Sequence, residues 1–444
     1  MASGGGEKNN PKTIFGWCMY DWANSAYATT VMVGLLPAYF AEVVVGREGA
    51  TLGGTTYAAD TLWAFTVGVA TLIAFLTAPV LGAIADFSAA RKRFLLSFAY
   101  TGCLFSLLLY FSQSGDVVQT LVFFTLAQVG FTGANVFYDS FLPRIASDDQ
   151  MDWVSGKGFS YGYGGGGLQF ALSLALVALH DWFGLTQAQA VRLGIVMAAV
   201  WWAAFSLFTV RYLKETDTAE PLPARYAAWP RTLAYAHIGV TRTLATTRRV
   251  GRFRHLAIFL LAFMLYDDAI QTVINLATVY GKVELELPTV YLLLTLLLVQ
   301  AIASLGALMF SRLAGRIGTK RTIMLTLGLW SGVVVYAYFI QTTAQFFVLG
   351  AVVGIVLGGT QALSRSFYGS MVPEEASAEF YGFYTVFSKF AAMWGPWLFA
   401  IVKQATGSSR TAIVSLIALF LAGLILLLFV DEKKAREAKL AGAF

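Results

Sequence analysis

Residues 137–147 read FYDSFLPRIAS and residues 367–377 read FYGSMVPEEAS, so six of eleven positions repeat at an offset of 230 residues. Residues 20–23 (YDWA) are echoed in the same way by residues 266–269 (YDDA). A third, looser echo at an offset of 229 pairs residues 82–93 with residues 311–321. Three echoes in the same order along the chain indicate an internal repeat of two similar halves.

The composition is that of a membrane protein. Of 444 residues, 57% are hydrophobic and 13% are charged, whereas a soluble domain carries roughly 25% charged residues. This excludes a cytosolic enzyme, a nucleic-acid binder and a disordered scaffold. The net charge of +6 requires no nucleic-acid partner, because cytoplasmic loops of membrane proteins collect Lys and Arg. Cys18 and Cys103 give neither a disulfide framework nor a metal cluster, and we expect no metal or cofactor. The polar start (residues 1–11) predicts no cleavable signal peptide.

The apolar runs predict an all-α polytopic protein with twelve membrane-spanning helices. Residues 214–254 form the longest stretch that is not apolar, so we expect a six-helix bundle on each side of a cytoplasmic linker. The expected units are residues 1–213, 214–254, 255–430 and a cytoplasmic tail of residues 431–444. The expected spans are 14–45, 60–85, 94–112, 117–142, 157–180, 189–213, 255–281, 289–311, 322–341, 344–372, 380–403 and 411–430.

The basic residues predict the topology. Most of the 31 Lys and Arg fall in the N-terminal tail, the even-numbered loops, the linker and the C-terminal tail. The positive-inside rule therefore predicts that both termini are cytoplasmic, so that equivalent spans of the two halves run in the same direction. The opposite side holds only Arg47, Arg192, Lys282, Lys403 and Arg410.

The linker has two interpretations. It is basic, and Leu233, Val240 and Leu244 recur at helical spacing with Trp229 nearby. This pattern suits an amphipathic helix on the membrane surface, and it suits a solvated linker equally well.

Several motifs resemble a known family. The loop residues Gly82, Asp86, Arg91 and Lys92 resemble the signature between spans two and three of the major facilitator superfamily. Residues 20–26 (YDWANSA) are similar to the first-span signature of its vacuole-effluxer-like branch, which includes autophagy-related amino-acid effluxers and bacterial relatives. Further similarities to that branch cover nearly the whole chain: Gly162-Tyr163, Gly165-Gly166, Leu265-Tyr266, Asp268, residues 381–384 (YGFY), Lys389 and Gly395-Pro396.

The sequence also departs from these motifs. Phe87 and Ala89 replace the usual Arg and Gly of the signature loop, and Gly315 replaces its Asp in the second half, which weakens the expectation of a charge lock there. Asp267 and Ala269 replace the usual Asn and Gly that flank Asp268.

The resemblance implies the major facilitator fold, in which spans one, four, seven and ten line a central cavity. Intramembrane polar residues normally face a cavity or a partner, and here they recur at helical spacing on those four spans. The stripes are Asp21, Asn24, Ser25 and Ala28; Gln128, Thr132, Asn135 and Asp139; Asp268, Gln271 and Asn275, with Asp267 also aligned; and Gln361, Arg365 and Tyr368.

Depth in the membrane suggests the role of each residue. At about 1.5 Å per residue, Asp268 lies about 20 Å into its span, Lys389 about 15 Å and Asp21 about 10 Å. Burial disfavours the charged form of a carboxylate, which makes Asp268 and its neighbour Asp267 candidate proton carriers. The predicted substrate- and proton-binding set is Asp21, Asn24, Asn135, Asp267, Asp268, Gln271, Asn275 and Lys389.

These residues also have structural interpretations. An aspartate neutralised by Lys389 or Arg365 can serve helix packing alone, and Asp21 can brace a break in span one. Lys389 suits a countercharge or anion recognition equally. The Gly run at residues 164–167 predicts close helix packing rather than a phosphate loop.

A second set of residues is expected to form a cytoplasmic gate. Its members lie at or near the cytoplasmic ends of their spans, and a bare topology signal is the alternative. They are Asp86, Arg91, Lys92, Asp139 and Arg365.

The sequence thus predicts a secondary active transporter that moves a small polar solute, such as an amino acid, by alternating access with proton coupling. The alternatives are uniport of an amphiphile, sugar or organic anion, a membrane-embedded enzyme, or a receptor. Three scattered His residues and no nucleophile elbow count against an enzyme. We expect a monomer in a bacterial inner membrane, with solute, protons and lipids as partners and no nucleic acid.

Overall fold

The computed structural model describes residues 8–215, 218–249, 253–391 and 394–440 and is mostly helical. The two halves of the chain each supply a set of long helices. The N-terminal half contains α1 (Pro11–Ala26), η1 (Tyr27–Leu35), α2 (Leu36–Tyr39), η2 (Phe40–Val45), α3 (Ala59–Ser88), α4 (Arg91–Leu108), η3 (Leu109–Phe111), α5 (Val117–Ser140), α6 (Leu142–Ile145), α7 (Met151–Ala178), η4 (His180–Phe183) and α8 (Gln187–Tyr212).

The linker and the C-terminal half follow the same plan. They contain η5 (Ala224–Tyr226), α9 (Arg231–Arg249), α10 (Arg254–Glu284), α11 (Thr289–Ile317), α12 (Thr319–Phe339), α13 (Thr343–Met371), η7 (Glu374–Ala376), α14 (Ser377–Ala391), α15 (Trp394–Thr406), α16 (Ser409–Ser415), α17 (Ile417–Leu428) and α18 (Glu432–Leu440).

Each of the twelve expected spans corresponds to a long helix or a run of helices. By length and composition, 11 helices of the described residues are able to cross a membrane, and α7 is not among them. Glycines and polar residues lower the hydropathy of α7, yet it has 28 residues and packs against α1, α8, α11 and α13. It therefore occupies the place of the fifth expected span, although it starts at Met151 rather than at residue 157.

The first span contains an irregularity, because it runs on beyond α1 through the π-helical segments η1 and η2. The eleventh consists of α14 and α15, and residues 392–393 between them lie outside the described part of the chain.

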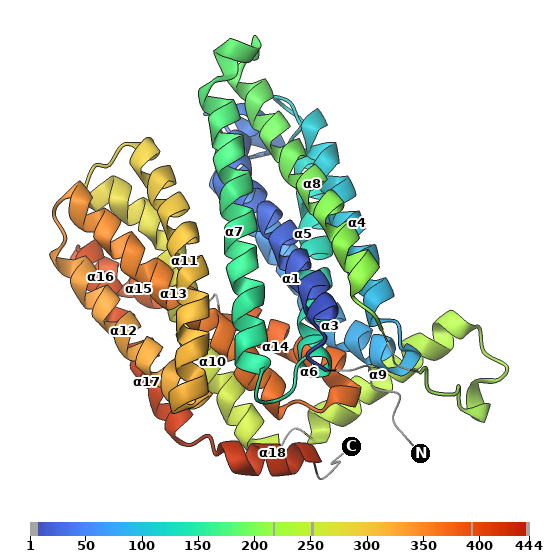
Figure 1. Cartoon of the computed structure of the whole chain (residues 1–444). Coiled ribbons are helices and arrows are strands. Elements are labelled where there is room, and N and C mark those ends of the chain that lie inside the picture. Colours follow the sequence, from blue (N-terminus) through green and yellow to red (C-terminus); the bar gives the residue numbers. More distant parts are fainter. Residues whose placement is uncertain (1–7, 216–217, 250–252, 392–393, 441–444) are drawn as a thin grey trace.

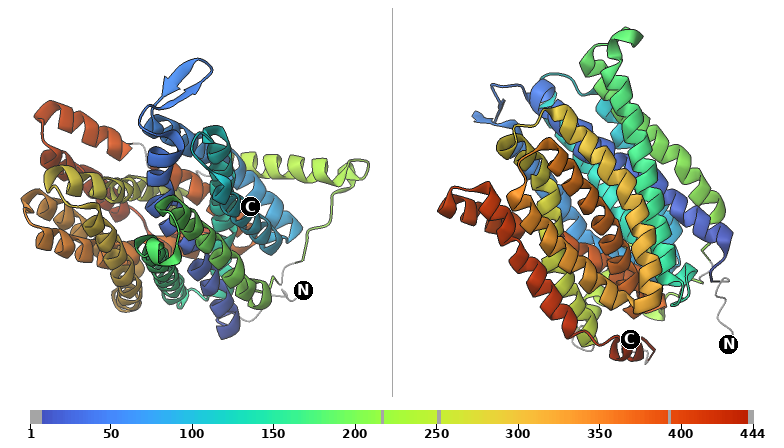
Figure 2. Two further views of the ribbon diagram at one scale, coloured as in Figure 1. Left: turned by 90° about the horizontal axis from the view of Figure 1, so that it is seen from above. Right: turned by 60° about the vertical axis from the view of Figure 1, so that its left-hand side comes forward.

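The helices form two bundles, α1–α8 and α10–α17 (Figure 1). They contact each other through α7 against α11 and α13, and through α3 against α14. Seen from above, α9 extends sideways from the N-terminal bundle (Figure 2). Both termini lie at the same end of the molecule, which we call the terminal end (Figure 1). Its location in the cytoplasm stays a prediction.

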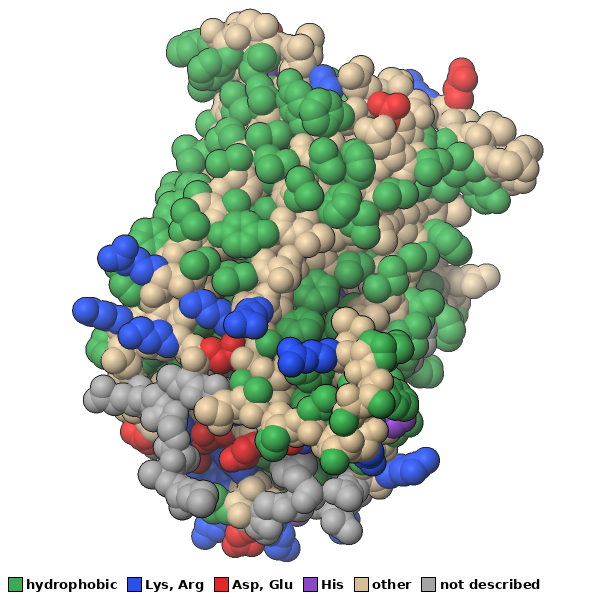
Figure 3. Space-filling model, turned by 90° about the vertical axis from the view of Figure 1, so that its right-hand side faces the viewer, with side chains coloured by type: hydrophobic (Ala, Val, Ile, Leu, Met, Phe, Trp, Pro, Cys, Tyr) green, Lys and Arg blue, Asp and Glu red, His purple; other side chains and the backbone are tan. Residues whose placement is uncertain are grey.

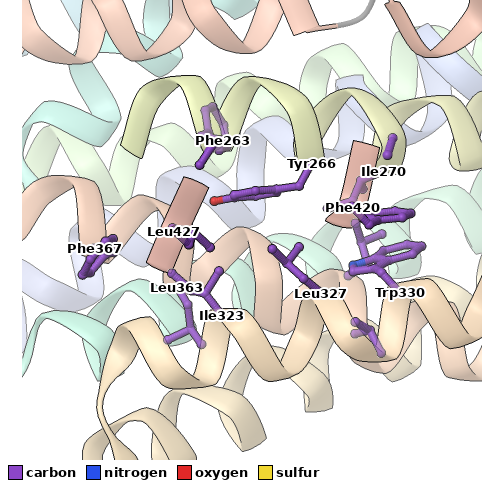
Figure 4. Close-up of a cluster of buried hydrophobic side chains, with 14 of the residues drawn as sticks. Phe263, Tyr266, Ile270, Ile323, Leu327, Trp330, Leu363, Phe367, Phe420 and Leu427 are labelled. Carbon is purple, nitrogen blue, oxygen red and sulfur yellow. The ribbon is translucent and has the colours of Figure 1, made fainter. Parts of the chain in front are cut away.

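Each bundle has its own apolar core. In the C-terminal bundle, Tyr266 of α10, Trp330 of α12 and Phe420 of α17 belong to one buried cluster, and the Trp330 and Phe420 rings are stacked with centroids 5.8 Å apart (Figure 4). Glycines allow close contact in the N-terminal bundle. A Cβ atom at Gly165 of α7 would lie 2.8 Å from the Cα atom of Trp22 in α1, so only glycine fits there. This confirms the close packing expected for the Gly run.

A short hairpin was not expected from the sequence. Strands β1 (Ala50–Leu52) and β2 (Thr55–Tyr57) pair antiparallel between η2 and α3. Gly53 and Gly54 form the turn with φ values of +59° and +84°, and such a pair is a favoured hairpin turn because glycine tolerates positive φ.

Candidate solute-binding site

A cavity of about 150 Å³ lies between the bundles. Its volume exceeds that of one water molecule, which needs roughly 10–15 Å³ by the same kind of measure. Most of its polar lining comes from the C-terminal bundle, and aromatic rings of Phe159, Tyr266 and Tyr384 complete the walls. The polar lining residues are Asp139, Asp267, Gln271, Thr360, Gln361, Ser364, Arg365 and Ser388.

Asp267 and Asp139 are the two acidic residues among those that line the cavity, and Asp267 belongs to the C-terminal bundle. Its Oδ2 accepts a hydrogen bond from Ser388 Oγ at 2.9 Å, and its Oδ1 accepts a longer one from Gln271 Nε2 at 3.4 Å. Its residue exposure is 4%. Both donors are neutral, so they orient the carboxylate without cancelling its charge.

Arg365 closes the cavity toward the terminal end. Its Nη1 lies 3.0 Å from Oδ1 of Asp139 in the opposite bundle. Its Nε and Nη2 donate to Oγ and the carbonyl oxygen of Ser155 in α7 at 3.0 and 2.9 Å. The guanidinium lies over the Phe159 ring at 4.1 Å. Arg365, Asp139 and Ser155 thus join α13 to α5 and α7 of the other bundle.

Asp21 belongs to this closure and not to the cavity lining. Its Oδ2 accepts a hydrogen bond from Tyr138 Oη at 3.1 Å and lies 3.7 Å from Arg365 Nη1. Its Oδ1 accepts one from Ser25 Oγ at 3.3 Å. The Arg365 guanidinium is therefore shared between two carboxylates of the N-terminal bundle.

Asp268 lies away from the cavity. It is fully buried, and its Oδ2 accepts a hydrogen bond from the backbone N–H of Gly395 at 2.6 Å. Gly395 is in the first turn of α15, where backbone N–H groups have no partner within the helix. Asp268 of α10 therefore contacts the start of α15 in span eleven. It does not line the cavity, although its depth in the membrane suggested a place in the binding site.

The remaining expected binding residues are also separated from the cavity. Asn24 Nδ2 donates to Asn135 Oδ1 at 2.6 Å, which ties α1 to α5 inside the N-terminal bundle. Asn275 is exposed, and Lys389 is half-buried next to Ser388. Among the described residues, no hydrogen bond or ion pair of Lys389 is found. Of the eight expected binding residues, the cavity is lined by Asp267 and Gln271.

Of the expected gate residues at the ends of α3 and α4, Asp86 contacts the other bundle, whereas Lys92 does not. Asp86 accepts hydrogen bonds from the backbone N–H groups of Ala378 and Glu379 at 3.2 and 2.9 Å. Arg91 Nε lies 2.6 Å from Asp86 Oδ1, and both side chains are 1% exposed. Lys92 Nζ instead donates to the Val210 carbonyl at 2.8 Å, within its own bundle.

Further contacts between the bundles were not expected from the sequence, and two examples involve Asp152 and Tyr163. Asp152, at the start of α7, accepts hydrogen bonds from Ser366 Oγ at 2.5 Å and from Thr319 Oγ1 at 2.7 Å. Tyr163 Oη donates to Gln361 Oε1 at 2.5 Å. Asp152 lies near the loop in which Gly315 replaces the expected acid, so an acid of the opposite bundle provides the polar contact there. In the sequence, the position of Asp152 in the first turn of a long helix was the feature that could have indicated this contact.

Comparison with known proteins places the chain in a family. The model of the family described as "Vacuole effluxer Atg22 like" matches residues 9–440. The chain belongs to this Atg22-like family. A Bacillus subtilis (strain 168) member, described as the uncharacterized MFS-type transporter YxiO, is 33% identical over 427 residues, which are 95% of each chain. Autophagy-related protein 22 of Coccidioides immitis (strain RS) is 25% identical over 549 residues, covering 98% of this chain and 89% of that one.

Solved structures support the fold of this Atg22-like chain. The human organic anion transporter MFSD10 (TETRAN) has a TM-score of 0.72 at 13% identity and covers 95% of this chain and 100% of its own. The proton:xylose symporter XylE has a TM-score of 0.70 at 14% identity, with 97% and 99% covered. The predicted family and major facilitator fold are confirmed. Because the relatives are MFS-type transporters, the chain is a multi-pass membrane transporter and not an enzyme.

Proposed function

We propose that this transporter moves a small polar solute, such as an amino acid, by alternating access, and that proton binding at Asp267 couples its movement to a proton gradient. The cavity between the bundles carries this proposal, because it combines a buried carboxylate with amide groups of Gln271 and Gln361. Sites at the interface of two repeats near the middle of the membrane are typical of transporter substrates.

An amino acid presents one cationic and one anionic group, and the C-terminal bundle offers a match for each. Asp267 suits an ammonium group. Lys389 follows Ser388 on α14 and suits a carboxylate, whereas the Arg365 guanidinium is already bound to Asp139 and Ser155. We therefore propose that Lys389, which does not line the cavity in this conformation, binds the solute carboxylate in another one.

Proton coupling follows from the surroundings of Asp267. A buried carboxylate that is held by neutral donors is neutralised when it binds a proton or a cationic solute group. Competition between these two cations for one carboxylate links solute release to proton uptake.

The positions of the contacts between the bundles support the proposal of alternating access. The Arg365–Asp139 ion pair, the Asp86 contacts with α14 and the Asp152 contacts with α12 and α13 all lie toward the terminal end. These contacts hold the terminal end closed. Opening the cavity toward that end requires that all of them break, and we propose that Asp86, Arg91, Asp139 and Arg365 form this gate.

We further propose that the protein works as a monomer in a bacterial cell membrane. A single chain supplies both walls and the closure of the cavity. The Bacillus subtilis relative matches over 95% of each chain, which supports a bacterial setting.

The test is a solute screen in proteoliposomes with a pH gradient, covering amino acids, sugars and organic anions. Wild type is compared with Asp267→Asn and Asp268→Asn. We expect one class of small polar solute to accumulate with wild type and not with Asp267→Asn. If no solute moves under any gradient, the proposed function fails. If all three proteins accumulate solute equally, the proposed coupling residue is wrong.

A further inference from the structure

The linker helix α9 lies on the membrane-facing side of α3. Leu72 and Leu76 form an exposed row along α3, and Val80 and Ile84 continue this row toward the terminal end at the same four-residue spacing. Gly239 of α9 packs on Val80 and Ile84, because a Cβ atom there would lie 2.9 Å from the Val80 carbonyl oxygen. Helix α9 therefore covers the part of α3 that would otherwise contact lipid at the membrane boundary.

One face of α9 is anchored on this surface. Ala234 and Ile238 are buried against Phe87 and Tyr226. The Arg242 guanidinium lies 5.0 Å from the centroid of the Phe87 ring and 2.5 Å from Glu220 Oε2. These contacts fix the rotation of the helix about its own axis and hence the direction of its other faces.

The second face of α9 is apolar and exposed. Leu233, Val240 and Leu244 are 58%, 45% and 52% exposed, and Trp229 just before the helix is 45% exposed. At about 100° per residue these positions form one stripe, roughly opposite the face that carries Ile238 and Gly239. Exposure of such a stripe to water is unfavourable, whereas its burial at the boundary between lipid headgroups and acyl chains is favourable.

Positive charge accompanies the stripe. Arg225, Arg231 and Arg248 are exposed, and no ion pair of these three is found among the described residues. Lys and Arg gather on the lower part of this side of the molecule, below a surface dominated by hydrophobic side chains (Figure 3). Basic residues beside an interfacial apolar stripe attract anionic headgroups.

We propose that α9 binds the membrane surface and takes anionic phospholipid headgroups as its ligand. The apolar stripe enters the boundary region, and Arg225, Arg231 and Arg248 bind the headgroups. Because α9 also packs on Phe87, next to Asp86, lipid binding supports the end of α3 that contacts α14.

The first test uses the full-length protein in detergent, with thermal unfolding followed as phosphatidylglycerol or phosphatidylcholine is added. Phosphatidylglycerol is expected to raise the unfolding temperature of the wild-type protein more than phosphatidylcholine does. The triple variant Arg225→Gln, Arg231→Gln, Arg248→Gln should need roughly a hundredfold more of it for half of the effect. A matched variant, Lys433→Gln, Lys434→Gln, Arg436→Gln on exposed positions of α18, removes the same charge and should respond as wild type.

A second measurement tests the apolar stripe separately. Cys18 and Cys103 are buried, so an environment-sensitive dye attaches to an introduced Val240→Cys. In phosphatidylglycerol nanodiscs its emission should shift to the blue, while a dye at Lys433→Cys should report water. A water-like dye at position 240, or an equal lipid response of the two triple variants, overturns the proposal and leaves α9 as a solvated linker.

Discussion

Asp267 and Asp268 are neighbours in α10, but their carboxylates contact different parts of the structure. Asp267 Oδ2 binds Ser388 Oγ at 2.9 Å on the cavity wall, and Asp268 Oδ2 binds the backbone N–H of Gly395 at 2.6 Å in α15. Successive helix positions point about 100° apart, so the two acids diverge. In the sequence repeat Asp267 matches Asp21, which contacts the closure at Arg365. The two matched acids thus lie in opposite bundles, Asp267 on the cavity wall and Asp21 at the closure.

Replacing Asp267 by Asn separates exchange from accumulation. Asn keeps the size of the side chain and an oxygen for the Ser388 hydroxyl, but it binds no proton in the physiological range. Because Asp267 is also the proposed site for the ammonium group of the solute, we expect Asp267→Asn to lose accumulation driven by a pH gradient and to exchange labelled for unlabelled solute only at a raised solute concentration. Asp268→Asn should retain both activities. If Asp268→Asn lost the accumulation driven by the pH gradient and Asp267→Asn kept it, Asp268 would be the coupling residue.

Replacing Asp268 by Ala should affect stability more than coupling. The change leaves the Gly395 N–H without its acceptor in a buried position. An unsatisfied buried donor costs about 1–3 kcal/mol, so the free energy of unfolding in detergent should fall by that amount. Asp268→Asn keeps an acceptor oxygen and should lose less. Equal losses for the Ala and Asn variants would show that the hydrogen bond to Gly395 is not what Asp268 contributes.

The Arg365–Asp139 ion pair should control closure of the terminal end. Arg365→Met leaves Asp139 and Asp21 without their cation, and breaking a buried pair costs about 3–5 kcal/mol. Spin labels at Arg93→Cys and Arg321→Cys, which lie at the terminal ends of α4 and α12, report the separation of the bundles. We expect a longer distance in Arg365→Met and partial recovery when Asp139→Asn is added. Additive effects of the two changes would mean that the pair does not couple the bundles.

The fold was predictable from the sequence because its signals are repeated. Hydrophobic runs recur twelve times, and the motif at residues 137–147 returns at residues 367–377. Membrane helices satisfy their own backbone groups, so each run determines one element without knowledge of its neighbours. The hydropathy signal was weakest for α7, where glycines that permit contact with α1 also lower the hydropathy.

The site was less predictable because it depends on side-chain direction and on contacts between helices. Helical spacing grouped Asp268 with Gln271, but spacing alone does not show which face of α10 points to the cavity. The backbone N–H of Gly395 that binds Asp268 belongs to another helix, and spacing along α10 does not reveal such a donor. Likewise, Asn24 and Asn135 pair with each other, a choice that spacing on separate helices leaves open.

Asp86 should hold the terminal end closed through α14. Its carboxylate accepts the backbone N–H groups of Ala378 and Glu379 in the first turn of that helix, where a negative charge also interacts favourably with the helix dipole. Asp86→Asn keeps the shape of the side chain but removes its charge and the ion pair with Arg91. The loss of about 1–2 kcal/mol should raise the open-to-closed ratio roughly fivefold to thirtyfold.

Lys92 provides the matched control for this prediction. It is near Asp86 in the same loop motif, yet its Nζ binds the Val210 carbonyl within its own bundle. Lys92→Gln should therefore leave the distance between labels at Arg93→Cys and Arg321→Cys unchanged, while Asp86→Asn lengthens it. If both variants open the terminal end to the same extent, the charge of the whole loop controls closure, and the contact between Asp86 and α14 does not.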